Sequence, residues 1–169
     1  MRLFGRREKP PEAAVSRLDR DERVVSWAST PDGGAVVATQ LGLWLPGAAA
    51  RLPWHLVDKA SWRDGRLTVT PAVDTGDGVL VEQAPVSVAL SVPRDLPQTV
   101  RVRVERAIAY TSHSRLPSGG GVRVVGRRVA GRDGVTWQRV FDPGVDPADP
   151  AVLAAVARLV ERARVEVGM

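Results

Sequence analysis

The stretch that decides the fold is Pro85–Tyr110, PVSVALSVPRDLPQTVRVRVERAIAY. In its first part apolar residues alternate with small ones from Val86 to Val92, and a period of two is typical of a half-buried β-strand. Pro93 ends this strand, and the chain then predicts a helix over residues 95–110. The segments before this junction indicate short strands. The segments after it are basic and carry a second hairpin and helix.

The predicted helix has one apolar face. Its members follow the helical spacing i, i+4, i+8, i+11 and i+12, and they are Leu96, Val100, Val104, Ala107 and Ile108. Asp95 can cap the N-terminus, and Pro97 is tolerated in the first turn. The Val-Arg alternation over residues 100–104 would also fit a strand. The length, the cap and the Glu-Arg-Ala-Ile-Ala tail favour the helix.

From residue 23 to residue 92 the sequence indicates seven strands. Turn signals recur about every ten residues, and Asp-Gly, which suits the positive φ angles of tight hairpins, begins at residues 32, 64 and 77. The expected strands are 24–29, 35–39, 42–45, 51–62, 66–70, 79–83 and 86–92. This half lacks the helical stretches that a parallel βαβ fold requires. The pattern predicts an antiparallel meander, barrel or sandwich.

Four of the five tryptophans lie in these predicted strands. They are Trp27, Trp44, Trp54 and Trp62. Buried, they would fill a small barrel, and exposed together, they would mark a ligand groove. We expect them in the core, because each sits in an apolar strand and no basic residues are interleaved with them.

The chain divides into three predicted parts. Residues 1–18 are expected to be a flexible basic arm, because two prolines interrupt any regular element. Residues 19–110 form the barrel with its closing helix. Residues 111–169 form a β-hairpin and a C-terminal helix packed on the barrel.

The third part begins with a predicted linker over residues 111–121, which ends in three glycines. No helix follows these glycines, so they predict a hinge and not a phosphate-binding loop. Strands 122–130 and 135–141 come next. The last helix starts at Pro150, with Asp149 as its N-cap.

Composition excludes several classes of site. The 169 residues include no cysteine, which excludes disulfides, thiolate metal sites and a cysteine nucleophile. The two histidines and the acidic residues form no metal-ligand spacing, so we expect no metal, no cofactor and no enzyme. No apolar run could span a bilayer, and no signal-peptide core follows the charged N-terminus, so a cytoplasmic location is expected.

The positive charge lies in the second half of the chain. Residues 1–92 have a net charge of zero, whereas residues 93–169 carry the whole net charge of +5. A helix and hairpin rich in arginine could bind phosphates or carboxylates, and the alternative is that these arginines only solvate the surface. The candidate binding residues are Arg101, Arg103, Arg106, Arg123, Arg127, Arg128, Arg132, Trp137 and Arg139. The hairpin members of this set are expected to lie near one another.

Seven antiparallel strands followed by a helix resemble the element order of a pleckstrin-homology (PH)-like domain over residues 20–110. The resemblance implies a bent barrel plugged by the helix and a non-catalytic binding role. PH-like domains that bind phosphoinositides carry basic residues in the first strand loop, whereas here that loop, residues 29–34, has none. The phrases Arg51-Leu-Pro-Trp-His-Leu-Val57 and Gly134-Val-Thr-Trp-Gln138 resemble those of small actinobacterial proteins, which implies no activity.

The sequence therefore predicts an α+β protein with an antiparallel, barrel-like sheet of about seven strands closed by a helix, followed by a hairpin and a C-terminal helix. The expected function is a non-catalytic binding or scaffolding module with a protein partner. The alternative is a nucleic-acid-associated protein that contacts phosphates through the arginine-rich helix and hairpin. Membrane contact is not expected.

Overall fold

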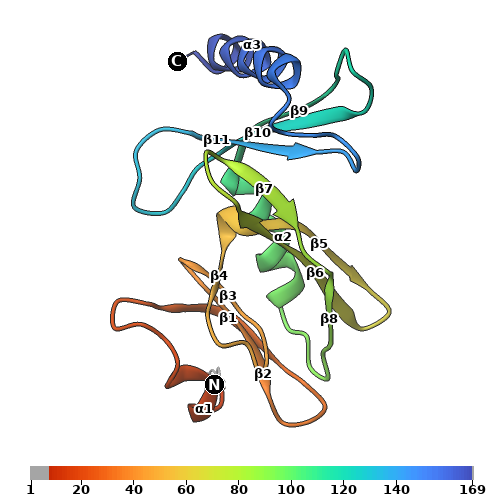
Figure 1. Cartoon of the computed structure of the whole chain (residues 1–169). Coiled ribbons are helices and arrows are strands. Elements are labelled where there is room, and N and C mark those ends of the chain that lie inside the picture. The colour runs from red at the N-terminus through yellow and green to blue at the C-terminus, as the bar shows by residue number, and fades with distance from the viewer. Residues whose placement is uncertain (1–7, 169) are drawn as a thin grey trace.

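In the computed structural model, which describes residues 8–168, the strand–proline–helix junction forms as predicted (Figure 1). Strand β8 (Val86–Ala89) leads into helix α2 (Leu96–Ala107). The four predicted face residues within the helix, Leu96, Val100, Val104 and Ala107, are buried. The helix ends before the predicted residue 110, because Ile108 is extended (φ −91°, ψ 117°) and begins the next strand.

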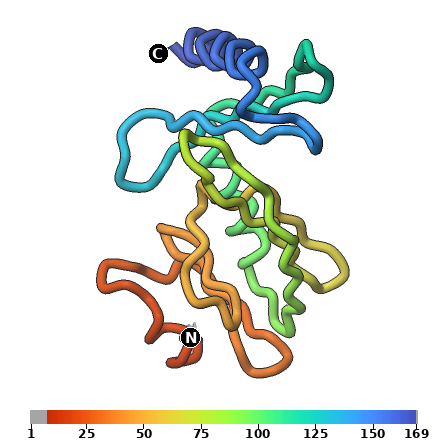
Figure 2. Tube along the Cα trace, viewed as in Figure 1, coloured from red at the N-terminus to blue at the C-terminus, as the bar shows by residue number. Residues whose placement is uncertain are grey.

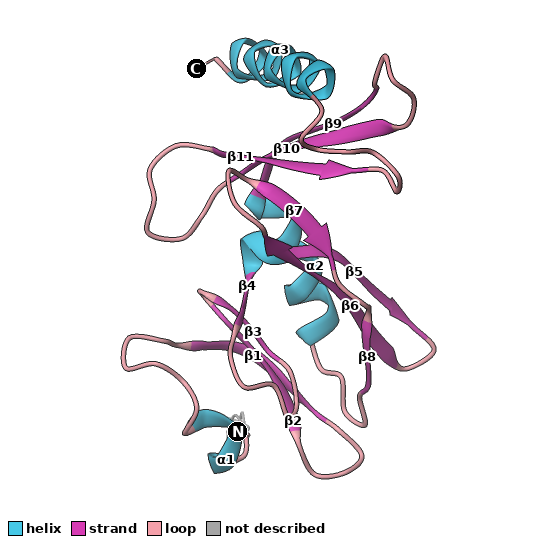
Figure 3. Cartoon of the chain, in the orientation of Figure 1, coloured by secondary structure: helices cyan, strands magenta, loops and turns pink. Residues whose placement is uncertain are grey.

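The remaining elements follow in chain order. The first half contains α1 (Glu12–Val15), β1 (Val24–Ser29), β2 (Ala35–Thr39), β3 (Gly42–Trp44), β4 (Leu52–Pro53), the 3-10 turn η1 (Trp54–Leu56), β5 (Val57–Arg63), β6 (Arg66–Asp74) and β7 (Val79–Glu82). The part after α2 contains β9 (Ile108–Arg115), β10 (Gly121–Arg127), β11 (Thr136–Phe141) and α3 (Pro150–Val167). The protein is α+β, as predicted (Figure 3).

The strands form two sheets. Strands β1-β2-β3-β4 make an antiparallel sheet, and a larger sheet has the order β5-β6-β7-β11-β10-β9, with β8 also paired to β6. This larger sheet curls into a half-barrel. It is mixed, because β7 and β11 run parallel. The predicted single antiparallel sheet of residues 24–92 is therefore divided between two sheets, the hairpin strands β10 and β11 belong to the larger one, and that sheet is antiparallel except between β7 and β11.

The length of β6 explains the mixed sheet. Its first half pairs with β8 from Arg66 to Val69, and its second half pairs with β7 from Ala72 to Asp74. The second half thus carries β7 beyond β8 toward the C-terminal hairpin, where its free edge meets β11. The sequence predicted a strand only to Thr70, so this extension was not foreseen.

Helix α2 fills the space between the two sheets, as the tube in Figure 2 shows. Its buried face packs with residues of β1–β3, β5 and β6 in one hydrophobic core. A bridge between Ser29 and Val92 joins the sheets along one side. Burial of such apolar area is worth about 25 cal/mol per Å² and is the main source of stability.

The predicted linker over residues 111–121 is wrong. Strand β9 occupies residues 111–115 of it and pairs with β10 from Arg115 to Ile108. Gly119 and Gly120 lie in the turn between β9 and β10 and have the positive φ angles that the turn requires, and Gly121 begins β10, so the glycines form no hinge. The hairpin prediction is confirmed with shorter strands.

Helix α3 is confirmed with its predicted cap. Asp149 Oδ1 accepts a hydrogen bond from the amide of Ala151 at 2.8 Å. The apolar stripe of α3 packs on β9 and β10 and makes a second core. None of the helices within residues 8–168 is both long and apolar enough to cross a membrane.

Residues 8–18 of the predicted flexible arm lie on the outer face of the first sheet, whereas residues 1–7 lie outside the described residues. Ala14 and Leu18 pack against Val37 and Trp44 in a third small core. No helix was predicted here because Pro10 and Pro11 interrupt regular elements, but these prolines come before α1 and not within it.

The tryptophan prediction is right for two of the four. Trp44 and Trp54 are 8% and 7% exposed and belong to cores. Trp27 is half-buried beneath the Arg94 guanidinium, whose central carbon is 4.3 Å from the ring centroid. Trp62 is 40% exposed, so it is the tryptophan that a partner could reach.

Candidate functional site

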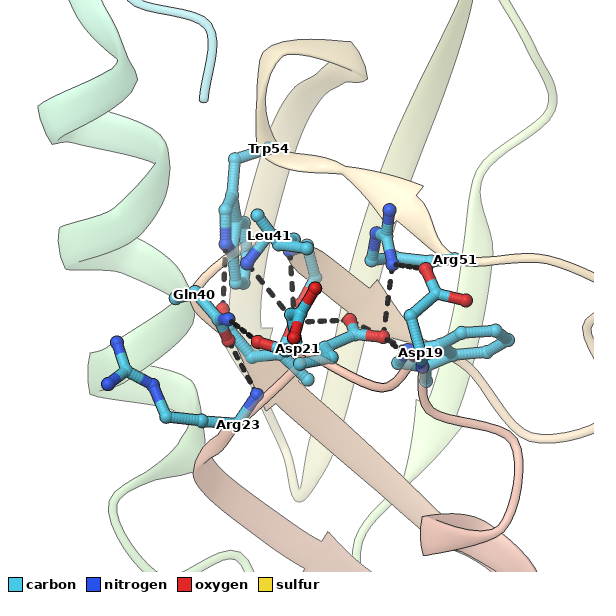
Figure 4. A network of polar contacts seen from close by, with 11 residues as sticks. Asp19, Asp21, Arg23, Gln40, Leu41, Arg51 and Trp54 are labelled. Atoms are coloured by element: carbon cyan, nitrogen blue, oxygen red, sulfur yellow. Dashed lines mark hydrogen bonds and ion pairs between the residues drawn. The ribbon is translucent and has the colours of Figure 1, made fainter. Parts of the chain in front are cut away.

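Figure 4 shows a network of polar contacts that includes Asp19 and Arg51, and the buried Glu22 belongs to this network. The Glu22 carboxylate accepts hydrogen bonds from Thr39 Oγ1 at 2.6 Å, from Trp44 Nε1 at 3.0 Å and from Arg51 Nη1 at 3.0 Å. Burial raises the pKa of Glu22, but these bonds and the amide of Asp19 outweigh it, so the pKa lies below its ordinary value. Both oxygens are satisfied internally. The network therefore anchors the N-terminal segment to the first sheet.

Two of the predicted binding arginines point into the molecule. Arg123 and Arg127 lie four positions apart on one face of β10, the face turned toward β5. Arg123 Nη2 donates to both oxygens of Asp58 at 2.7 and 2.8 Å, and Arg127 Nη2 lies 3.8 Å from Asp58 Oδ1. Lys59 and Glu82 complete this group, which we call the Asp58 cluster.

Arg127 is 0% exposed, so it cannot contact an external phosphate as the sequence predicted. Within the described chain, none of its three guanidinium nitrogens has a hydrogen-bond partner, and the nearby Gln138 Oε1 also has none. Burial lowers the pKa of Arg127, Asp58 opposes this effect, and Arg123 adds to it. The Asp58 cluster thus joins β5, at one end of the half-barrel, to β10, the strand next to the other end, with an excess of positive charge.

The remaining hairpin residues do not share one surface with Arg123. Arg139 lies opposite Val124 in the ladder, so Arg139 and Trp137 are on the face toward α3. Trp137 packs edge-on against Tyr110 with ring centroids 5.7 Å apart. Arg139 Nη1 donates to the carbonyl of Asp77. Arg132 is exposed on the loop between β10 and β11.

Three predicted residues do come together. Arg103 and Arg106 on α2 and Arg128 just after β10 line a hollow of about 150 Å³, which we call the arginine pocket. Its floor includes Trp54, and His55 lies beside it. Among residues 8–168, no acidic residue lines the pocket. It is the part of the predicted arginine surface that the fold assembles.

A second hollow was missed by the sequence analysis. The β5–α2 groove, about 390 Å³ in volume, runs between Ala60–Trp62 of β5 and residues 97–101 of α2. Leu67 and Val100 lie at its bottom and are buried, Trp62 is exposed beside them, and Arg101, paired with Glu105 at 2.8 Å, stands at its rim.

The geometry of the β5–β6 hairpin decides which main-chain groups face this groove. Asp64 and Gly65 have φ angles of 51° and 72°, as in a type I′ turn, and they join Arg63 to Arg66. In such a hairpin the flanking pair exchanges hydrogen bonds, and the pattern alternates along the ladder. Arg63 and Ser61 therefore bond to β6, whereas Ala60 and Trp62 direct their N–H and C=O groups outward.

Strand β5 is an edge strand. It pairs with β6 only, and within residues 8–168 no other hydrogen bond reaches the main chain of residues 59–63. The outward groups of Ala60 and Trp62 are therefore unpaired beside an apolar groove. An unpaired edge of this kind can pair with another chain. No local sequence signal marks it, because an edge is a property of the sheet order.

No protein-family model, curated protein or solved structure matches the chain.

Proposed function

We propose that the protein is a non-catalytic binding module and that the β5–α2 groove binds an extended segment of a partner protein. The observation that carries the proposal is the pair of unpaired main-chain positions, Ala60 and Trp62, beside the groove. A strand added to a sheet edge gains affinity from main-chain hydrogen bonds and specificity from side-chain pockets.

The residues that line the groove indicate which side chains the bound partner segment should carry. Trp62 is 40% exposed and lies beside the buried Leu67 and Val100, so one apolar side chain of the partner would pack against the Trp62 ring. Aromatic residues that are partly exposed in this way are enriched at interfaces. Arg63 has no ion-pair partner within the described chain, and Arg101 forms an ion pair with Glu105 alone within it. The expected partner segment is therefore extended, apolar at one position and acidic at its flanks.

The element order supports a binding role. Strands followed by a helix that plugs the core resemble a PH-like domain, which implies a non-catalytic module. The alternative, contact with nucleic acid through the arginines, has less support, because Arg123 and Arg127 are engaged with Asp58 inside the molecule.

The experiment selects peptides from a random library against the purified protein and measures Kd for the wild type and for Ala60→Pro. Proline at residue 60 removes only an outward N–H, and edge strands tolerate proline where the N–H faces solvent. The matched control is Ser61→Ala, because residue 61 bonds to β6. Circular dichroism checks the fold of both variants.

We expect Ala60→Pro to weaken peptide binding at least about fivefold, since the peptide carbonyl loses its donor, and Ser61→Ala to have little effect. Equal binding by wild type and Ala60→Pro would refute the proposal, as would failure of the library to yield any peptide. Binding to a DNA or RNA duplex that weakens steeply with salt and disappears in an Arg103→Ala, Arg106→Ala variant would favour the nucleic-acid alternative.

A further inference from the structure

The arginine pocket is a separate feature, on the opposite end of α2 from the β5–α2 groove. Arg103 and Arg106 are on the last two turns of α2, and Arg128 follows β10. With residues 40–41 and 54–55, which also line the pocket, four separate chain segments thus converge on one hollow. Their convergence is a product of the fold and not of local sequence.

The three guanidinium groups lack anionic partners. Among residues 8–168, none of the three forms an ion pair, whereas Arg51, Arg94, Arg101, Arg123, Arg127 and Arg164 each do so. Arg128 Nη1 makes one long hydrogen bond of 3.4 Å, to the carbonyl of Arg106. The donors of Arg103 and of the Arg106 side chain have no protein acceptor within this part of the chain. Most of the hydrogen-bonding capacity of the three groups is therefore available.

Compensation of the helix dipole does not account for all of this charge. The C-terminal end of a helix carries about half a negative unit charge, and α2 ends at Ala107, whose carbonyl already accepts a hydrogen bond from the amide of Arg128 at 2.8 Å. Three full positive charges exceed that requirement. The surplus is positive by more than two units within one small hollow.

A second observation supports a positive potential at this position. His55, beside the pocket, has a lowered pKa, caused first by burial and then by the charges of Arg127 and Arg132, whereas Asp74 opposes the shift. Arg127 is fully buried with its guanidinium nitrogens unpartnered within the described residues. Buried positive charge of this kind strengthens the attraction for an anion through the low-dielectric interior.

The size of the pocket limits the ligand. About 150 Å³ is below the range of roughly 300–1,000 Å³ found for drug-sized ligands. A nucleotide or an inositol polyphosphate therefore does not fit inside, whereas a single tetrahedral oxyanion does. Guanidinium groups bind phosphate oxygens with paired, charge-assisted hydrogen bonds.

We infer that Arg103, Arg106 and Arg128 form a binding site for one phosphate group, either free phosphate or a phosphate monoester. Gln40, which also lines the pocket, is the neutral polar group at its edge. The buried indole of Trp54 forms an apolar floor, since its Nε1 is already bonded to the carbonyl of Thr39 at 2.9 Å. This site does not depend on the β5–α2 groove, and either can be present without the other.

The experiment titrates the full chain with sodium phosphate and, in a parallel arm, with O-phosphoserine. Sodium chloride keeps the ionic strength constant. NMR follows the Arg Nε–Hε signals and the His55 ring, and isothermal titration calorimetry measures Kd. Arg103→Gln and Arg128→Gln remove one group each, and Arg115→Gln is the matched control, because Arg115 is an exposed arginine outside the pocket.

We expect one saturable site, a rise in the pKa of His55 when phosphate is bound, and at least about tenfold weaker binding in Arg103→Gln and Arg128→Gln, since each loses charge-assisted bonds. Arg115→Gln should bind as the wild type does. Tighter binding of O-phosphoserine would assign the phosphate to a larger molecule, and equal binding would assign it to free phosphate.

Two results would overturn the inference. One is the absence of saturable binding of either probe at constant ionic strength. The other is an equal loss in Arg115→Gln and in the pocket variants, because that would show a diffuse attraction to the basic surface and not a site. The thermal unfolding of each variant checks that it is folded. Arg103 is half-buried on α2, and if Arg103→Gln fails to fold, the test depends on Arg128→Gln, because Arg128 is exposed.

Discussion

Replacing Asp58 by asparagine tests the Asp58 cluster, which joins β5 to β10. The side chain of Asp58 is 0% exposed, accepts two hydrogen bonds from Arg123 and lies 3.8 Å from Arg127. Asparagine has the same shape, so the perturbation removes one negative charge and little volume. Arg127 then remains buried without an anion.

The magnitude follows from this distance. Two unit charges at about 4 Å attract by about 4 kcal/mol at an effective dielectric constant of 20, and removal of one partner from a buried pair typically costs about 3–5 kcal/mol. We therefore expect Asp58→Asn to lower the free energy of unfolding by about 3–5 kcal/mol. With a urea m-value of about 2 kcal/mol/M, the unfolding midpoint should fall by about 2 M.

The assay is urea unfolding followed by tryptophan fluorescence and circular dichroism, with two comparison variants. Glu82→Gln, which removes a partly exposed partner of Arg123 at 3.3 Å, should cost less than about 1 kcal/mol. Arg127→Met added to Asp58→Asn should recover most of the loss, because it removes the unpaired buried charge. The reasoning is refuted if Asp58→Asn unfolds within about 1 kcal/mol of the wild type, or if the double variant is no more stable than the single one.

Two further predictions concern the first sheet. Because the folded-state pKa of Glu22 is lowered, Glu22 stabilises the fold above its unfolded pKa of about 4.3, and this stability is lost as the pH falls through the folded-state pKa. The free energy of unfolding of Glu22→Gln should therefore change less than that of the wild type over this acidic range. A variant whose free energy of unfolding falls with pH in parallel with the wild type would contradict this prediction. Gly42→Ala places a Cβ 2.3 Å from the Leu52 carbonyl oxygen and should separate β3 from β4, at a cost of about 2 kcal/mol in thermal unfolding. The Cβ added in Gly131→Ala meets no atom within 4 Å, so this variant should lose only the roughly 1 kcal/mol needed to hold alanine in a left-handed backbone conformation. An equal loss of stability in Gly42→Ala and Gly131→Ala would contradict the steric argument.

The elements that the sequence predicted well are those with strong local signals. The apolar spacing of α2, the Asp149 cap of α3 and the Asp64-Gly65 turn each depend on neighbours within a few residues. Strand β9 was missed because its residues, IAYTSHSR, are mostly polar, and three glycines follow it. One face of β9 is solvated at the edge of the half-barrel, so no alternating apolar pattern was required.

The candidate site could be predicted only in part. The arginines of the hairpin are close in sequence, but alternate positions of a strand face opposite sides, so Arg123 and Arg139 separate. Asp58 lies 65 residues before Arg123, and no local pattern joins them. The β5–α2 groove depends on which strand lies at the sheet edge, and this follows from tertiary pairing alone.

The most direct test of the proposed function is hydrogen exchange of the β5 amides, measured by NMR in the free protein and with a selected peptide. The account predicts that the Ala60 and Trp62 amides exchange rapidly in the free protein while Ser61 and Arg63, bonded to β6, are protected. Addition of the peptide should then protect Ala60 and Trp62. Equal protection of all four amides in the free protein, or no change when the peptide is bound, would contradict the account.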